Sequence, residues 1–232
     1  MRWRGTTATH PVSVEPITVA ILAKAPIPGL VKTRLEPVLG ADGAAALQAR
    51  LIHRTVETAR AAAVGPITIW ATPDIRYPIF QEFAELPNVT LARQPDSDLG
   101  GRMLYALMAA SPALIIGTDC PSLEPSHLRT AADVLRGGFD AVVISAEDGG
   151  YGLIGSRVLH VALFSNIRWG ADTVMADTRR RMLELGLSWR EPLQLWDLDR
   201  PEDLDRLQQE GLGALLHGLG EVGADAASDA RS

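Results

Sequence analysis

The stretch ITVAILAKAPIPGLVKTRL, residues 17–35, decides the fold expected for this chain. Its first seven residues are mostly apolar or β-branched, which predicts a buried strand over 17–23. In the loop that follows, two prolines fix the backbone path and a glycine permits close approach. Three cations lie in this loop, Lys24, Lys32 and Arg34. A cationic loop at the carboxyl end of a strand is a usual place for phosphate in α/β proteins.

Apolar runs and helical stretches alternate along the rest of the chain. The further predicted strands span residues 67–71, 88–93, 113–117, 139–146 and 193–198. The predicted helices span residues 41–64, 78–86, 98–110, 125–136, 171–185 and 201–209. Strands that alternate with helices form mostly parallel sheets with both faces covered. We therefore expect an α/β fold of three layers, α/β/α, around a mostly parallel mixed sheet.

Composition and charge exclude several classes of protein. The chain has 232 residues and a formal net charge of -6, which argues against a general nucleic-acid binder. Cys120 is the only cysteine, so an intrachain disulfide and a multi-cysteine zinc site are both excluded. No apolar run reaches membrane-spanning length, and residues 1–16 lack the apolar block of a secretory signal. We expect a cytoplasmic protein that contacts neither membrane nor nucleic acid.

One domain is expected over residues 17–210, because no linker-like stretch interrupts that range. Residues 1–16 are predicted to form a flexible arm. Glycine, alanine and small polar residues dominate from residue 211 onward, which predicts a loose or disordered tail over 211–232.

Two interpretations of the cationic loop stay open. In the first, Lys24, Lys32 and Arg34 neutralise the phosphates of a nucleotide during transfer chemistry, with Ala23 and Gly29 allowing its approach. In the second, the loop is a basic surface segment that forms salt bridges with acidic neighbours. Neither the GxxxxGK[ST] spacing of a P-loop nor the GxGxxG fingerprint occurs here.

Asp119 follows a buried strand, at the edge where open α/β sheets hold their ligands. A lone carboxylate there suits Mg²⁺, which binds one or two carboxylates together with substrate phosphates. The alternative is a turn or cap ahead of the helix that begins at Pro125. Cys120 is interpreted as a small apolar filler, because no histidine lies near it in sequence.

Asp148, Gly149 and Gly150 follow the next predicted strand. Asp148 is a candidate to bind a hydroxyl or a metal, and the two glycines allow a nucleotide close to the backbone. The pair Asp-Gly before a second apolar run also predicts a hairpin turn, and both interpretations can hold together.

Asp197 and Asp199 lie two residues apart, which places them on the same side of a strand. Asp199 is the second metal-ligand candidate, expected to face Asp119. The alternative, helix capping and dipole compensation, accounts for Glu202 and Asp203.

Weaker signals add four candidates. Gly100 and Arg102 lie in the first turn of a helix, where Arg102 can reach a phosphate or remain a surface side chain. Gln94 is a candidate to contact a base or ribose. Trp169 is expected either to shape the acceptor side or to belong to the core.

Six segments together resemble a known family. They are AKAPIPGLVKTRL (23–35), DLGGRM (98–103), IIGTDCPSL (115–123), EDGGYGLIG (147–155), RW (168–169) and DLDRPEDL (197–204). Over about residues 17–210 the chain resembles the DUF2064 family, the radical-SAM/selenodomain-associated transferase 1 proteins of the GT-A, nucleotide-diphospho-sugar transferase superfamily. The resemblance implies a Rossmann-like GT-A domain with a divalent metal, in a family usually described as glycosyltransferases without an assigned substrate.

The first loop is also similar to that of 2-phospho-lactate guanylyltransferase, which ends in K[ST]RL. By that similarity the three loop cations hold nucleotide phosphates, Asp119 holds the metal, and Asp199 replaces the second metal-binding residue. The chain departs from the family pattern at Gly152, where an aromatic residue is common.

Three hypotheses of function follow. The first is a Mg²⁺- or Mn²⁺-dependent nucleotidyltransferase acting on a nucleoside triphosphate and a small phosphorylated acceptor, with Lys24, Lys32, Arg34 and Asp148 as catalytic residues. The second is a glycosyltransferase that uses a nucleotide-diphospho sugar. The third is a non-catalytic nucleotide-binding protein. The number of cations in the first loop favours the first hypothesis.

Overall fold

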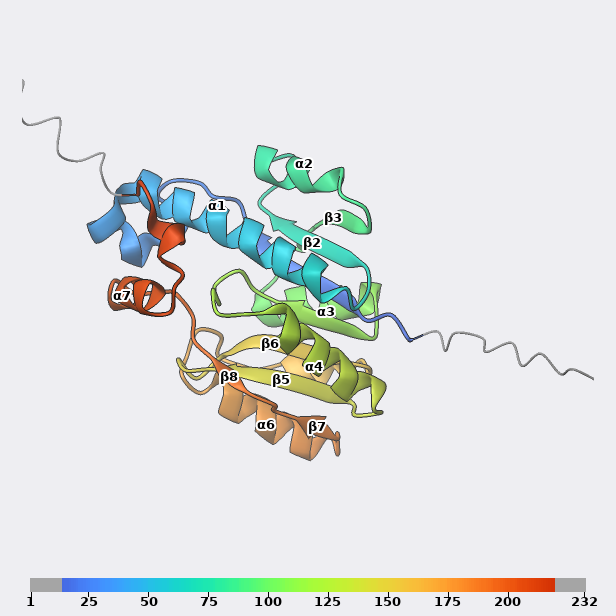
Figure 1. Cartoon of the computed structure of the whole chain (residues 1–232). Helices are drawn as coiled ribbons and strands as arrows, with labels where there is room; N and C mark the ends of the chain where they lie inside the picture. The colour runs from blue at the N-terminus through green and yellow to red at the C-terminus, as the bar shows by residue number, and fades with distance from the viewer. Residues whose placement is uncertain (1–13, 220–232) are drawn as a thin grey trace, which may run out of the picture.

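One mixed sheet organises the computed structural model, which describes residues 14–219 (Figure 1). Its strands run in the order β3-β2-β1-β4-β6-β5-β7, and the short β8 pairs with β5. The strands are β1 (Thr18–Lys24), β2 (Ile67–Thr72), β3 (Val89–Arg93), β4 (Ala113–Ile116), β5 (Ala141–Ala146), β6 (Tyr151–Ser156), β7 (Trp189–Arg190) and β8 (Gln194–Leu195). The mostly parallel α/β fold expected from the sequence is confirmed.

β1 is the central strand of the parallel half of the sheet. Its Ile21 lies opposite Ile69 of β2 and Ile116 of β4, both in parallel register. β6 then runs antiparallel to both β4 and β5, because β5 and β6 form the hairpin indicated by Asp148-Gly149. The sequence has a second apolar run after this turn, and that run forms β6.

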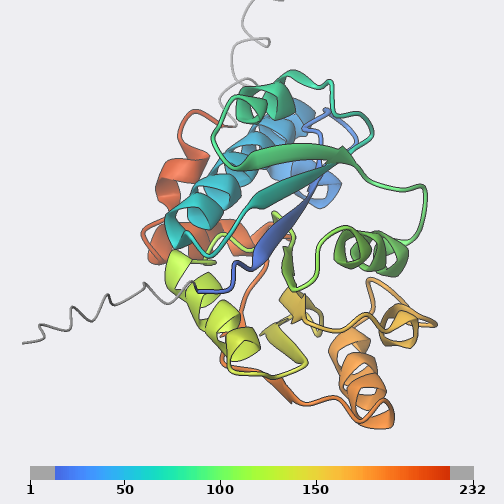
Figure 2. The same ribbon diagram turned by 90° about the vertical axis from the view of Figure 1, so that its right-hand side faces the viewer.

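Helices cover both faces of the sheet. They are α1 (Glu36–Ala62), α2 (Pro78–Ala84), α3 (Leu99–Ala109), α4 (Pro125–Arg136), α5 (Val161–Phe164), α6 (Val174–Glu184) and α7 (Glu202–Gln209). α1, α2 and α4 pack on the face that carries Val19 and Ile21, and α3, α5 and α6 pack on the opposite face with Ala20 (Figure 2). Alternate residues of β1 therefore serve two separate cores, as the period of a strand requires.

Three expected boundaries were wrong. α1 begins five residues before the expected start, and Gly40 kinks it near that start. The expected strand over 193–198 is limited to β8, and the short β7, which the sequence did not predict, precedes it; Pro192 between them cannot donate to a sheet. Residues 213–216, expected to be loose, form a 3-10 helix, η2, and Leu215 packs on the core between α1 and α7.

The ordered part of the chain thus continues past residue 210. The predicted flexible arm and loose tail fall largely on residues 1–13 and 220–232, which lie outside the described residues. Within residues 14–219, no helix is long and apolar enough to cross a membrane.

Candidate active site

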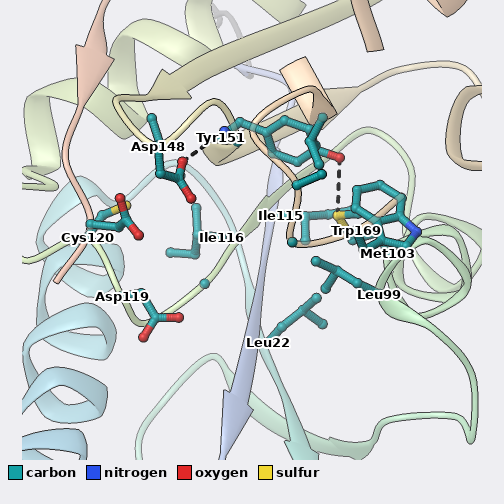
Figure 3. A pocket seen from close by; sticks show the side chains of 18 residues that line it. Leu22, Leu99, Met103, Ile115, Ile116, Asp119, Cys120, Asp148, Tyr151 and Trp169 are labelled. Carbon is teal, nitrogen blue, oxygen red and sulfur yellow. Dashed lines mark hydrogen bonds between the residues drawn. The ribbon is translucent and has the colours of Figure 1, made fainter. Parts of the chain in front are cut away.

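A pocket of about 300 Å³ opens at the carboxyl ends of β1 and β4 (Figure 3). Its acidic half is formed by Asp119, Asp148 and Asp197. Its apolar half is formed by large side chains from β1, α3, β4, β6 and the segment before α6; they are Leu22, Leu99, Met103, Ile115, Tyr151 and Trp169. The pocket lies where open α/β sheets bind ligands.

Backbone contacts hold the three acids at this edge. Asp119 follows β4, and its carbonyl accepts a hydrogen bond from the N–H of Leu198 at 2.8 Å, which fixes the Asp197 segment beside β4. Asp148 lies in the β5–β6 turn, where its carboxylate accepts from the N–H of Gly150 at 2.8 Å. Asp148 therefore lies in the predicted hairpin turn and also lines the pocket.

Gly149 is the residue that makes this turn possible. Its φ of 90° lies in the left-handed region, and a Cβ added there would lie 2.1 Å from the carbonyl oxygen of Asp172. Its own carbonyl accepts from the N–H of Met175 at 2.8 Å, which joins the turn to α6. Glycine is required here for packing as well as for φ.

Negative charge accumulates around Asp197. Partial burial, followed by the nearby carboxylates of Asp148, Asp199 and Asp119, raises the pKa of Asp197 to about 6. Burial and the carboxylates of Asp119 and Asp197 likewise raise the pKa of the Cys120 thiol well above its usual range. Cys120 is therefore a poor nucleophile, in agreement with its interpretation as a filler.

The cationic loop reaches two of the predicted metal ligands. Lys32 forms an ion pair with Asp119 and donates to the carbonyl of Leu198 at 2.5 Å, with 5% of its side chain exposed. Arg34 pairs with Asp199. Lys32 and Arg34 thus form salt bridges with acidic neighbours, as the second interpretation of the loop expects. Their partners lie at the edge of the sheet where the pocket opens.

Other loop candidates take local positions. Lys24 donates to the carbonyl of Leu30 at 2.7 Å and is exposed. Gly29 has a φ of 76° within the turn. None of the three loop cations lines the pocket itself.

Gln94 is buried and supports its neighbours. Its amide donates to the carbonyls of Trp70 at 2.7 Å and Ala23 at 3.2 Å, and its oxygen accepts from Arg102 at 3.2 Å. These contacts join the ends of β1 and β2 to α3. Gln94 thus has the contacts of a residue that positions Arg102.

Gly100 contacts the pocket wall from α3. A Cβ at this position would lie 2.7 Å from the indole ring of Trp169. Asp98 is the N-cap of this helix, and its carboxylate accepts from the N–H of Gly101 at 2.8 Å. Trp169 therefore lies directly on the first turn of α3 and shapes the pocket.

Asp199 does not line the pocket, whereas Asp197 does. The chain turns toward α7 after Asp197, and the carboxylate of Asp203 accepts from the N–H groups of Asp199 and Arg200 at 2.9 and 2.7 Å. Asp203, in the first turn of α7, thus fixes the two residues just before Pro201, which is the N-cap of this helix. Sequence reasoning placed Asp197 and Asp199 on one side of a strand but selected only Asp199. The alternation pointed to both acids equally and could not by itself favour Asp197.

The donor set around the pocket fits a hard divalent cation. Carboxylate oxygens are the ligands that Mg²⁺ and Mn²⁺ accept, and the side chains of Asp119, Asp148 and Asp197 line the same pocket. Within residues 14–219, no three His, Cys, Asp or Glu side chains are grouped closely enough to hold a metal by themselves.

Comparisons with known proteins agree with this geometry. A family model described as an uncharacterised protein conserved in bacteria, DUF2064, matches residues 55–171. The crystal structure of a candidate nucleotide-diphospho-sugar transferase from Desulfovibrio desulfuricans G20 is 30% identical, with a TM-score of 0.71, and the match covers 79% of this chain and 82% of that chain.

Two more distant structures share the fold alone. A nucleotidyl transferase from Methanothermobacter thermautotrophicus is 17% identical, with a TM-score of 0.54 over 86% of this chain and 100% of that chain. A manganese complex of Rv0371C from Mycobacterium tuberculosis H37Rv is 18% identical, with a TM-score of 0.52 over 84% of this chain and 99% of that chain. Among curated proteins, no sequence matches this chain.

Proposed function

Because this chain belongs to the DUF2064 family and has the fold of nucleotide-dependent transferases, we propose that it transfers a group from a nucleotide to a small acceptor with a divalent metal. One observation carries the proposal. Lys32 of the first loop meets Asp119 and the Leu198 carbonyl at the edge of the sheet, beside the acidic half of the pocket. The lysine proposed to bind phosphate and the carboxylate proposed to bind the metal are therefore adjacent.

Nucleotidyl transfer is the reaction that we favour. A phosphate oxygen of the acceptor attacks the α-phosphorus of a nucleoside triphosphate, a new P–O bond forms, and the bond to pyrophosphate breaks. Lys24, Lys32 and Arg34 stabilise the charge on the phosphate oxygens, because fixed cations act strongly where charge develops. Arg34 first releases Asp199, with which it pairs on the exposed surface. The nucleotidyl transferase among the similar folds supports this choice.

Asp119 and Asp199 are the metal ligands proposed from the sequence, and Asp197 is added because it lines the pocket. Bound there, Mg²⁺ or Mn²⁺ would neutralise phosphate oxygens that the carboxylates otherwise repel. The manganese complex among the similar folds supports a divalent cation. Besides its proposed contact with phosphate, Lys32 pairs with Asp119 and so holds that carboxylate at the pocket edge.

The remaining candidates surround the donor. Gly149 and Gly150 keep the β5–β6 turn free of side chains, and Asp148 orients a reacting hydroxyl or phosphate from that turn. Arg102, positioned by Gln94 and the Ser97 carbonyl, is placed to meet a phosphate near α3. Gly100 leaves room for the indole ring of Trp169, which lines the pocket.

Glycosyl transfer is the second candidate, and one observation favours it. The Desulfovibrio protein, which is 30% identical over most of both chains, is named for nucleotide-diphospho-sugar transfer. In this reaction Asp119 and the metal would hold the diphosphate leaving group. Asp148 would contact the donor sugar or the acceptor.

An activity screen separates the candidates. The pure protein is incubated with each nucleoside triphosphate or nucleotide-diphospho sugar, Mg²⁺ or Mn²⁺, and a panel of phosphorylated and unphosphorylated acceptors. We expect pyrophosphate release with one triphosphate, and loss of at least 100-fold in Asp119→Asn. Turnover of a nucleotide sugar with no pyrophosphate release in any mixture would assign glycosyl transfer instead. Absence of both reactions, with nucleotide binding kept, would indicate a non-catalytic nucleotide-binding protein.

A further inference from the structure

The apolar half of the pocket has a wall of two aromatic rings. Tyr151 and Trp169 meet edge to face, with ring centroids 6.4 Å apart and an interplanar angle of 86° (Figure 3). The Tyr151 hydroxyl lies 3.8 Å from the sulfur of Met103. Burial raises the pKa of Tyr151 well above its usual range, so that its ring remains a neutral phenol. This wall offers an uncharged surface to a ligand.

The wall is held in place by its neighbours. Gly100 leaves room for the indole of Trp169 on α3, since a Cβ there would lie 2.7 Å from the ring. Leu99, at the rim, is 43% exposed although it is apolar. An apolar wall with an exposed leucine beside it is suited to cover an apolar group of a ligand.

The charged side chains that line the pocket are all of one sign. The only charged side chains among its lining residues in the described part of the chain are the carboxylates of Asp119, Asp148 and Asp197. Lys32 and Arg34 pair with acids, and Lys24 contacts the Leu30 carbonyl, without lining the pocket. An anion placed against the aromatic wall would find no cation there and would be repelled by the three carboxylates.

We propose that the acceptor carries an uncharged apolar group, an aromatic ring or a branched hydrocarbon of similar size, which packs on Tyr151 and Trp169. Its reacting end lies toward the three aspartates. A volume of about 300 Å³ is at the lower end for small-molecule sites, so a ring on a short linker fits better than a long chain. The inference rests on the proposed function in assigning this ligand the part of acceptor.

Isothermal titration calorimetry with three probes, in the presence of Mn²⁺, tests whether an apolar group on the ligand adds to its affinity. They are 2-phenylethyl phosphate, 2-phenylethanol and ethyl phosphate. The ring should make at least one phenylethyl compound bind about tenfold or more tightly than ethyl phosphate, because burial of a ring contributes strongly to affinity. Comparison of the two phenylethyl compounds shows whether the reacting end also carries a phosphate. Equal affinity for all three probes would overturn the proposal.

Two variants locate the binding. Ala171→Phe places a ring in the pocket and should weaken phenylethyl binding at least tenfold, whereas Leu99→Ala should weaken it about threefold. Leu159→Ala is the matched control, because Leu159 is 46% exposed and lies outside the pocket lining. Because Leu99 is exposed, Leu99→Ala is expected to fold, so the location can still be tested if Ala171→Phe does not fold. Unchanged phenylethyl affinity in Leu99→Ala would contradict the assigned place.

The same titrations separate this inference from the proposed function. Triphosphates and nucleotide sugars are titrated into the wild-type protein in parallel. If phenylethyl compounds bind in the pocket and no nucleotide binds, the apolar site stands and the transferase proposal fails. If nucleotides bind and the ring adds nothing to affinity, the transferase proposal stands and this inference fails.

Discussion

At the scale of single residues, the site concentrates negative charge that is only partly balanced. Asp119 pairs with Lys32 and Asp199 pairs with Arg34. Asp197 forms no ion pair within residues 14–219, and its partial burial, together with the nearby carboxylates of Asp148, Asp199 and Asp119, raises its pKa to about 6. Burial of a charged carboxylate and repulsion from its neighbours lower the stability of the folded protein and favour cation binding.

Substitution of Asp197 tests this repulsion through pH. Because its folded-state pKa lies above the ordinary value of 3.8, protonation favours the folded state, and that stability is lost as pH rises from about 4 through about 6. We expect Asp197→Asn to flatten the pH dependence of Tm in this window and to raise Tm above pH 7 by roughly 2–4 °C for each kcal/mol of repulsion removed. Thermal denaturation monitored by circular dichroism from pH 4 to 8 measures both effects.

Asp96→Asn is the control, since Asp96 is exposed and lies outside the pocket lining. This variant should reproduce the wild-type curve. A parallel fall of Tm at every pH in Asp197→Asn would show that Asp197 stabilises the apo fold, against the prediction.

Gly149 offers a second prediction at this scale. Gly149→Ala combines a positive φ with a contact of 2.1 Å to the Asp172 carbonyl, whereas Gly186→Ala has a φ of 65° and open space. We expect the first substitution to lower the free energy of unfolding by roughly 3 kcal/mol or more and the second by about 1 kcal/mol. Urea denaturation compares them. Equal losses would mean that the contact is relieved at no cost by movement of the turn.

At the scale of elements, Arg206 joins α7 to the hairpin that carries Asp148. Its guanidinium forms two hydrogen bonds with the carboxylate of Glu147, at 2.7 and 3.0 Å, and one with Glu210 at 2.9 Å. It also lies 4.7 Å above the ring centre of Trp196. The arrangement holds the turn before Asp148 against the segment that leads to Asp197.

Loss of this contact should loosen the hairpin locally. We expect Arg206→Ala to speed amide hydrogen exchange around residues 146–150 about tenfold or more, with little change near the opposite sheet edge at β3. Arg206→Lys should give an intermediate effect, because lysine keeps the charge but cannot form the two-pronged contact. Hydrogen exchange read by mass spectrometry measures this. Unchanged exchange at 146–150 in Arg206→Ala would show that Arg206 does not hold the hairpin in place.

At the scale of the whole molecule, the pattern of apolar runs predicted the layers, the parallel centre of the sheet and the hairpin after β5. Local signals of this kind are strong because each strand must bury alternate faces. The wall formed by Tyr151, Trp169 and Leu99 could not be predicted, since it unites β6, the segment before α6 and α3. The pairing of Arg34 with Asp199 likewise joins residues 165 positions apart and has no local signature.

The candidate acids were found because they follow strands, and the choice among them depended on tertiary structure. Asp197 and Asp199 alternate identically in sequence, and only the turn toward α7 separates their positions. The hydrogen bonds of Gln94 could not be predicted either, because its partners on β1, β2 and α3 come together only in the fold.

The central claim is that the first loop and Asp119 form one metal–nucleotide site, and a crystal soaked with Mn²⁺ and a non-hydrolysable triphosphate tests it most directly. The account predicts an anomalous manganese peak bound by the Asp119 carboxylate, with phosphates between that peak and the side chains of Lys24, Lys32 and Arg34. Soaking Asp119→Asn crystals in the same way should abolish the peak. Manganese bound away from Asp119, or phosphates that contact none of the three loop cations, would contradict the account.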